Sequence, residues 1–260
     1  MIYLEINKGD FVTRNSYNND IVFKVINIKD GMYYLKGVEV RLYADSVFAD
    51  LVKCEEPKDE NDNNETRNVS NVNKSEYFYL PGKILHIDGD NDYLDKCLKY
   101  YKKVGVYAVG KKIKEEDICD QIGTLLKEYK PDIVIITGHD AYYKKKGNIN
   151  DINNYKNTKY FIKAINVARN YEKSHDKLVI IAGACQSDYE ELIKAGANFA
   201  SSPKRVNIHA LDPAIIAVNI ALTERNKEID LKKVLEQTKY GKDGMGGILG
   251  NGLMYVGYPR

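Results

Sequence analysis

The segment "KLVIIAGACQS" (Lys177–Ser187) places a cysteine, Cys185, after a run of aliphatic residues and two small ones. The segment "IVIITGHD" (Ile133–Asp140) has the same construction, with a histidine, His139, near its end. Continuous aliphatic runs of this kind are typical of strands buried on both faces of a parallel sheet. We therefore expect two buried strands, each followed by a reactive side chain.

Further strands and helices alternate around these two segments. Strands are predicted at "KILHIDGD" (83–90), "VYAVG" (106–110) and "NFASSP" (198–203). Helical patterns occupy residues 91–104, 115–132, 158–173, 189–197, 212–224 and 230–240, and a glycine-rich tail follows at 241–252. This alternation predicts an α/β domain over residues 78–260, with a mostly parallel sheet covered by helices on both faces.

The N-terminal part of the chain has a different pattern. Short runs such as "DIVFKVINI", "MYYLKG" and "VEVRLYADS" are separated by turn residues, which predicts a small SH3-like or KOW-like β-barrel over residues 1–53. Residues 54–77 are rich in Asn, Asp and Glu and contain few large aliphatic residues. Such a segment buries too little apolar surface to offset its ordering entropy, so we expect a flexible polar linker.

Composition limits the classes of function. The 260 residues are 43% hydrophobic and carry a formal net charge of only +2, which gives no general reason to expect a nucleic-acid or membrane partner. The four cysteines show no C-x-x-C spacing, so we expect reduced thiols and no zinc site. The N-terminus lacks the pattern of a secretion signal, and no apolar run approaches the ~20 residues of a membrane span. We expect a protein that is cytoplasmic at synthesis and needs no cofactor.

The two strand ends predict a catalytic pair. In open parallel sheets, functional residues gather beyond the carboxyl ends of the strands, and consecutive strands are usually neighbours. His139 could then take up and return the proton of the Cys185 thiol, and a helix beginning near Ser187 would favour the thiolate. A lone cysteine is more often a packing residue, but the pair on consecutive strands favours catalysis.

The order of the two residues narrows the class of enzyme. His139 precedes Cys185 by 46 residues, and caspases have an Ala-Cys pair with the histidine about 50 residues upstream. The sequence thus resembles the caspase-like, or clan CD, cysteine peptidases, in which the histidine follows the third core strand and the cysteine the fourth. Class I glutamine amidotransferases have the reverse order.

A closer resemblance rests on several longer segments. They are "PGKILHIDGDNDYLDKCLKYYKK", "ITGHDAYYKKKG", "DINNYKNTKYF", "AGACQSDYEELIKAGANFASSPKR" and "IHALDP". Together they resemble the YabG sporulation protease family of endospore-forming bacteria. The resemblance implies a cysteine endopeptidase made on the mother-cell side during sporulation, and association with the spore coat is a further expectation. It also implies cleavage of spore coat and cortex-associated proteins and of itself, with a preference for arginine, and it places the catalytic residues at His139 and Cys185.

Two positions depart from the wider clan. Where caspases have glycine after the histidine, this chain has Asp140, whose backbone N–H, with that of Cys185, remains available for the oxyanion. Where arginine-specific clan members have aspartate two residues before the cysteine, this chain has Gly183. Another acid must then pair with a substrate arginine.

The candidates for that acid lie at several strand ends. Asp88 and Asp90, after the first strand of the α/β domain, are preferred, although a capping or turn role is the alternative. Asp140, Asp188 and Asp212 are weaker candidates.

Self-cleavage and a second function class complete the predictions. Arg67, in the polar linker, is the expected self-cleavage site, with Arg14 and Arg41 as alternatives. The competing function is a flavodoxin-like or receiver-like binding module without catalysis, whose strand-end acids hold a cation. It would need a phosphorylatable aspartate and a strand-end lysine, for which Asp140 and Lys204 are the nearest matches. The sequence leaves the oligomeric state open.

Overall fold

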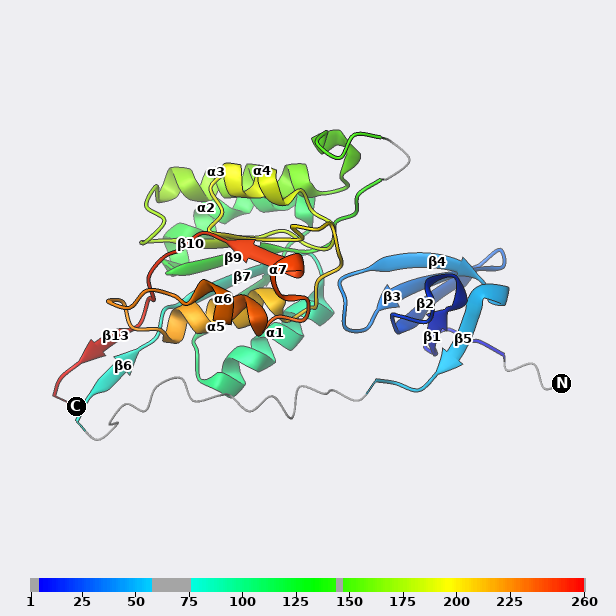
Figure 1. Ribbon diagram of the computed structural model, residues 1–260, viewed down its shortest axis with the longest axis horizontal. Helices are drawn as coiled ribbons and strands as arrows, with labels where there is room; N and C mark the ends of the chain where they lie inside the picture. Colours follow the sequence, from blue (N-terminus) through cyan, green and yellow to red (C-terminus); the bar gives the residue numbers. More distant parts are fainter. Residues whose placement is uncertain (1–4, 58–75, 144–146, 260) are drawn as a thin grey trace. The chain divides into compact units, whose positions relative to one another are not determined.

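A computed structural model of the protein describes residues 5–57, 76–143 and 147–259. The chain divides into two compact units, Met1–Glu65 and Thr66–Arg260, which are described separately (Figure 1). No helix among the described residues is long and apolar enough to cross a membrane.

The N-terminal unit is a five-stranded antiparallel sheet with the order β4-β3-β2-β1-β5. Its strands are β1 (Phe11–Arg14), β2 (Phe23–Lys29), β3 (Met32–Gly37), β4 (Tyr43–Val47) and β5 (Leu51–Cys54). The predicted strands correspond to β2, β3 and β4, while the four-residue β1 and β5 were not predicted. Val12, Phe23, Val25 and Leu35 form the centre of its core. The SH3-like type of this unit stays a prediction.

The C-terminal unit is built on a six-stranded sheet with the order β12-β11-β10-β9-β7-β8. The strands are β7 (Ile84–Asp88), β8 (Ala108–Lys112), β9 (Ile133–Thr137), β10 (Val179–Ala182), β11 (Phe199–Ser201) and β12 (Met245–Gly247). All neighbouring pairs are parallel except β11 and β12. The predicted mostly parallel sheet is therefore confirmed.

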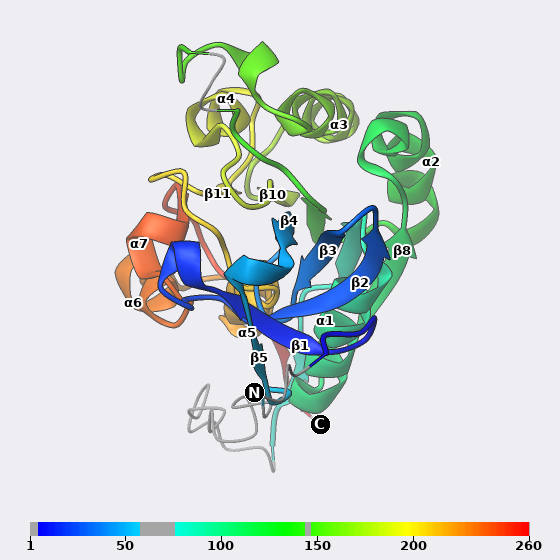
Figure 2. The same cartoon turned by 90° about the vertical axis from the view of Figure 1, so that its right-hand side faces the viewer.

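Helices cover both faces of this sheet, as Figures 1 and 2 show. They are α1 (Asn91–Val104), α2 (Ile118–Tyr129), α3 (Thr158–Tyr171), α4 (Tyr189–Lys194), α5 (Asp212–Leu222), α6 (Leu231–Glu236) and α7 (Gly241–Gly244). α2, α3 and α4 lie over one face, and α1, α5 and α6 over the other. Side chains of the central strands alternate between two cores, with Ile133 and Ile135 facing α1 and α5, and Val134 and Ile136 facing α2 and α3.

Capping residues fix the ends of α1. The Asp90 carboxylate accepts hydrogen bonds from the backbone N–H groups of Asp92 and Tyr93 and so satisfies two free donors of the first turn. At the other end Gly105 has a φ of 74°, a left-handed conformation that glycine adopts without steric cost. These caps explain why the predicted boundaries of this helix are correct.

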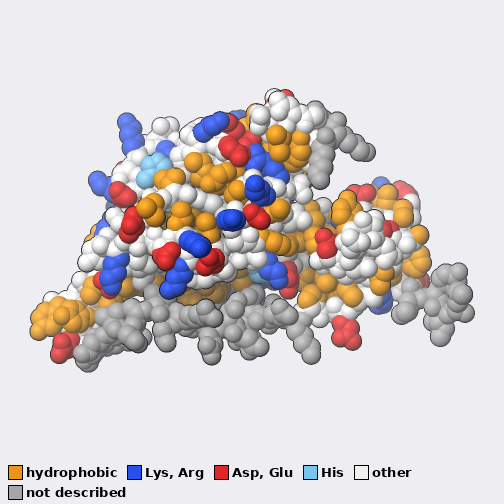
Figure 3. Space-filling model, viewed as in Figure 1, with side chains coloured by type: hydrophobic (Ala, Val, Ile, Leu, Met, Phe, Trp, Pro, Cys, Tyr) orange, Lys and Arg blue, Asp and Glu red, His pale blue; other side chains and the backbone are white. Residues whose placement is uncertain are grey.

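The glycine-rich segment after residue 240 is not a tail. It forms α7 and then the edge strand β12, which pairs antiparallel with β11. Near the C-terminus, β13 (Tyr255–Gly257) pairs with β6 (Phe78–Leu80) in a separate two-stranded ribbon. This ribbon carries exposed apolar side chains, which gather at one end of the space-filling view (Figure 3).

Candidate functional site

The carboxyl ends of β7, β9 and β10 are held side by side. Asp88 lies opposite Thr137 in the register of β7 and β9, and Ile136 lies opposite Ala182 in that of β9 and β10. Beyond the last pair, the Thr137 hydroxyl donates to the carbonyl oxygen of Gly183 at 2.8 Å. The prediction that the third and fourth strands are neighbours is confirmed. The turns that carry His139 and Cys185 therefore leave the same edge of the sheet from adjacent strands.

His139 lies between two carboxylates. Its Nε2 atom is 3.6 Å from Oδ2 of Asp90, and its Nδ1 atom is 3.5 Å from Oε1 of Glu115. The ring also packs at a centroid distance of 5.7 Å from Tyr93 on α1, and the side chain is 12% exposed. The backbone carbonyl of His139 accepts a hydrogen bond from the Asn157 side chain at 2.7 Å. The imidazole thus sits in a polar setting that is largely shielded from solvent.

Glu115 is a site residue that the sequence did not predict. It belongs to a 3-10 turn, Glu115–Asp117, which precedes α2 and stands where a regular helical turn was expected. Its Oε1 atom accepts a hydrogen bond from the backbone N–H of His139 at 2.7 Å. Burial acts to raise the pKa of Glu115, but the hydrogen bonds from the His139 side chain and backbone outweigh it, so the pKa is lowered.

Two glycines make room for this carboxylate. A Cβ atom on Gly89 would lie 2.6 Å from Cδ of Glu115, and one on Gly138 would lie 2.8 Å from the same atom. Because such distances are far below van der Waals contact, no larger residue fits at either turn without displacing Glu115. In the sequence, the only signal of this role of Glu115 is the pair of glycines, one after the first strand of the α/β domain and one directly before His139.

The Cys185 side chain is fully buried on the face of the sheet that α1 and α5 cover. Its sulfur accepts a hydrogen bond from the Ile208 N–H at 3.2 Å, and its thiol donates to the carbonyl oxygen of Ile208 at 3.7 Å. The N–H donor favours the thiolate, and the carbonyl acceptor favours the thiol. The expected helix begins only at Tyr189 and has Asp188 as its N-cap, so its dipole acts at some distance from the thiol.

Backbone geometry explains the missing aspartate at position 183. Gly183 has a φ of 100°, and a Cβ there would lie 2.7 Å from Cδ1 of Leu192. A residue with a side chain would be both strained and crowded. An aspartate therefore cannot be placed here as it is in arginine-specific clan CD peptidases.

Asp140 joins the histidine turn to the cysteine turn. Its Oδ2 atom accepts hydrogen bonds from the hydroxyls of Thr158 and Ser187, the latter at 2.8 Å. Its Oδ1 atom accepts from the N–H groups of Ala141 and Asn157 at 2.9 and 2.7 Å. Burial raises the pKa of Asp140, and these hydrogen bonds oppose the rise. A carboxylate with four protein donors is poorly suited to phosphorylation or to a substrate arginine.

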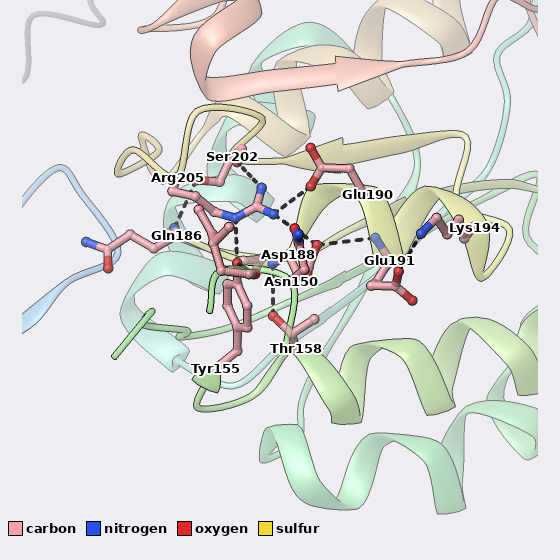
Figure 4. A network of polar contacts seen from close by, with 12 residues as sticks. Asn150, Tyr155, Thr158, Gln186, Asp188, Glu190, Glu191, Lys194, Ser202 and Arg205 are labelled. Carbon is pink, nitrogen blue, oxygen red and sulfur yellow. Dashed lines mark hydrogen bonds and ion pairs between the residues drawn. The ribbon is translucent and has the colours of Figure 1, made fainter. Parts of the chain in front are cut away.

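A second polar network holds the segment after β11 against α4 (Figure 4). Nη2 of Arg205 lies 3.0 Å from Oδ1 of Asp188 and 2.6 Å from Oε2 of Glu190. Nε of the same arginine donates to the Tyr155 hydroxyl at 2.7 Å. Asp188, one of the weaker candidate acids, therefore already has a guanidinium partner. The network fixes the segment that leads to Ile208 and hence to the Cys185 sulfur.

The two preferred acids occupy different environments. Asp90 caps α1 and faces His139, whereas Asp88 is fully buried with its Oδ2 atom 3.6 Å from Nε2 of His86. Nδ1 of His86 in turn lies 2.7 Å from the Tyr101 hydroxyl. Asp212, also fully buried, accepts hydrogen bonds from the backbone N–H groups of His209 and Lys239 at 2.9 Å each. Which acid would bind a substrate arginine stays a prediction.

The predicted self-cleavage positions differ in their surroundings. The Arg14 guanidinium lies 4.1 Å from the ring centroid of Tyr17, and the Arg41 side chain is fully buried. Arg67 lies outside the described residues. Within the described ranges, no group of three or more His, Cys, Asp or Glu side chains is arranged to hold a metal ion.

Comparison with known proteins identifies the family. The model of the family described as YabG peptidase U57 matches residues 7–259. The sporulation-specific protease YabG of Bacillus subtilis (strain 168) is 43% identical over 283 aligned positions, which cover 96% of this chain and 97% of that protein. No solved structure matches the chain. The match to the family model spans nearly the whole sequence, and the chain therefore belongs to the YabG peptidase U57 family.

Proposed function

We propose that this protein is a sporulation-associated cysteine endopeptidase of caspase-like type, with Cys185 as nucleophile and His139 as its acid and base. The observation that carries the proposal is the Asp140–Ser187 hydrogen bond, because it ties the two turns that bear these residues on adjacent strands. The family membership supports peptide-bond hydrolysis, and the YabG relative supports a role in sporulation.

The reaction would follow the chemistry of other cysteine peptidases. The Cys185 thiolate attacks the carbonyl carbon of the scissile bond, and the backbone N–H groups of Asp140 and Cys185 bind the oxyanion. His139 donates its proton to the leaving amine as the C–N bond breaks. Water, activated by the now neutral imidazole, hydrolyses the thioester and regenerates the thiol.

The proposed reaction requires that a substrate reach the buried Cys185 sulfur. Cys185 is 0% exposed, and the main chain of Ile208 contacts its sulfur. A substrate carbonyl can reach the sulfur only if the segment around Ile208 moves. Arg205, which lies three residues earlier and is fixed by Asp188 and Glu190, would therefore limit how far this segment opens.

The natural substrates would be spore coat and cortex-associated proteins and the enzyme itself, cut after arginine. A substrate guanidinium requires a carboxylate partner, and Asp88 and Asp90 stay the preferred candidates at this edge of the sheet. Both are buried, so either would bind the arginine in a setting of low dielectric where the pairing is strong.

Two cysteine variants test the nucleophile. Cys185→Ala is expected to abolish cleavage of arginine-containing peptides, because it removes the sulfur that attacks the scissile carbonyl. Cys97→Ala is the matched control: Cys97 is also fully buried in the same core, and its thiol lies 3.4 Å from the carbonyl oxygen of Ala210. Cys97→Ala should keep activity at a similar loss of stability. Full activity of Cys185→Ala would refute the proposal.

Self-cleavage is tested on the purified full chain. Intact-mass measurement of the wild type should show a cut after Arg67, and Cys185→Ala should stay whole. Arg67→Ala should shift or remove the cut while leaving cleavage of an added peptide unchanged. Identical intact masses of wild type and Cys185→Ala would contradict self-processing.

A further inference from the structure

We propose that Glu115 is a positioning residue for His139, which holds the imidazole in its working orientation. The inference rests on the proposed function of His139. It adds a third side chain to the proposed pair of His139 and Cys185. This side chain comes from the 3-10 turn before α2, which neither sequence spacing nor strand order would place at the site.

The first argument is that one oxygen atom contacts both the backbone and the ring of the same residue. Oε1 of Glu115 accepts the backbone N–H of His139 at 2.7 Å and lies 3.5 Å from its Nδ1 atom. The carboxylate is thus fixed relative to the main chain from which the imidazole projects. Rotation of the ring away from Oε1 would separate opposite charges whenever the imidazole is protonated.

The second argument is that the site is shaped around this carboxylate. Gly89 and Gly138 lie on the two strand ends that flank it, and a Cβ atom at either glycine would collide with its Cδ atom. Both strand-to-turn junctions therefore leave room for one side chain that arrives from a third element. This arrangement holds the carboxylate firmly, as a group that orients a catalytic base requires.

The third argument concerns charge. The Glu115 side chain is only 15% exposed, yet its pKa is lowered, so it is ionised at neutral pH. The other carboxylate beside the ring, Asp90, lies 3.6 Å from Nε2 and uses its Oδ1 atom to cap α1. The Tyr93 ring is tilted relative to the imidazole, and the two ring centroids are 5.7 Å apart. Two carboxyl groups thus face the imidazole, and that of Glu115 is also bonded to the backbone N–H of His139.

This arrangement assigns different tasks to the two ring nitrogens. With Glu115 beside Nδ1, the proton is favoured on that nitrogen, and Nε2, which lies 3.6 Å from Oδ2 of Asp90, exchanges a proton with the thiol and the leaving amine. The same division of labour holds wherever an acid orients a histidine that serves a nucleophile.

A purely structural role is the alternative, in which Glu115 only anchors the turn. Glu115→Gln separates the two, because the amide oxygen can still accept the His139 N–H while the negative charge is lost. We expect kcat to fall on the order of 10- to 100-fold with KM nearly unchanged. We also expect the alkaline limb of the pH–rate profile to move, because the negative charge beside Nδ1 is lost.

Glu116→Gln is the matched control, since it makes the same substitution at an exposed residue of the same 3-10 turn. It should leave kcat and the pH profile unchanged. Asp90→Asn is a further comparison, because asparagine keeps the helix cap. If Asp90→Asn moves the alkaline limb and Glu115→Gln does not, the assignment to Glu115 is wrong.

The outcome can be distinguished from failure of the proposed function. An active Cys185→Ala variant would overturn the enzyme mechanism as a whole. An inactive Cys185→Ala variant together with a Glu115→Gln enzyme of full kcat and unchanged pH profile would overturn only the role of Glu115. Thermal unfolding of each variant tests whether a lower kcat comes from unfolded protein.

Discussion

Oδ2 of Asp140 accepts a hydrogen bond from the Ser187 hydroxyl at 2.8 Å, and Oγ of Ser187 accepts one from the Ala184 N–H at 2.9 Å. This chain of two bonds runs from the residue after His139 to the residue before Cys185. Pairing of adjacent parallel strands determines where the following turns begin, but side-chain hydrogen bonds must hold the conformation of the turns. The Asp140–Ser187 bond does so for both turns at once.

Asp140→Asn should weaken both the fold and the activity. Asparagine has an NH2 group in place of one of the two carboxylate oxygens. At least one of the four hydrogen-bond donors therefore loses its acceptor, at a cost of about 1 to 3 kcal/mol in folding stability. Urea unfolding and peptide cleavage measure the two effects. Ser187→Ala and the double variant complete a cycle, in which the two losses of stability should not add, because the residues share one bond. Additive losses would show that the bond does not couple the turns.

Gly183→Ala should destabilise the C-terminal unit by about 1 to 3 kcal/mol, because an L-residue is strained at a φ of 100° and the new Cβ meets Leu192. Thermal unfolding gives the measurement. Gly250→Ala is the control, since no atom lies within 4 Å of a Cβ built there. Equal unfolding temperatures for the two variants would contradict the explanation of the missing aspartate.

Arg205→Lys should loosen the segment that leads to Ile208. Lysine cannot bond Asp188, Glu190 and Tyr155 together, so we expect a loss of stability of about 1 to 3 kcal/mol and easier access of substrate to the Cys185 sulfur. Limited proteolysis should show faster cutting within 202–208. Lys194→Gln removes an exposed ion pair with Glu191 and should change none of these readouts. Unchanged proteolysis of Arg205→Lys would contradict the prediction.

The stability of the protein should depend on pH through Glu115. Its pKa in the folded protein lies below the ordinary value of 4.5, so the charged form contributes stability that is present above pH 4.5. This contribution is lost as the pH falls through the lowered pKa. The stability difference between wild type and Glu115→Gln should therefore be largest near neutral pH and shrink in acid. A constant difference from pH 7 to pH 3 would count against an ionised Glu115.

The parts of the fold that follow from local pattern could be predicted from the sequence. Aliphatic runs gave β7, β9 and β10, and the pair Asp90 and Gly105 marked the ends of α1. The placement of His139 and Cys185 on neighbouring strands followed from the rule that consecutive strands pair. In each case the information lies within one segment or in chain order.

The parts that depend on distant contacts could not be predicted. Glu115 reaches His139 from a turn 24 residues earlier, and nothing in its own segment marks it as different from Glu116. The strands β6, β12 and β13 have three residues each, too few to show any periodicity. Asp140 was weighed as a binding acid, whereas its four donors come from three separate segments of the chain.

The pairing of β13 with β6 has a consequence for the order in which the structure forms during synthesis. Ribosomes release the chain from its N-terminal end, so β6 and the outer edge of β11 lack their strand partners until residues 245–257 have emerged. Ser202, which supports the Cys185 turn through Gln186, also donates to the Gly244 carbonyl at 2.7 Å and waits for the same residues. A nascent chain therefore completes the hydrogen bonds around the Cys185 turn only after residues 244–257 have been made.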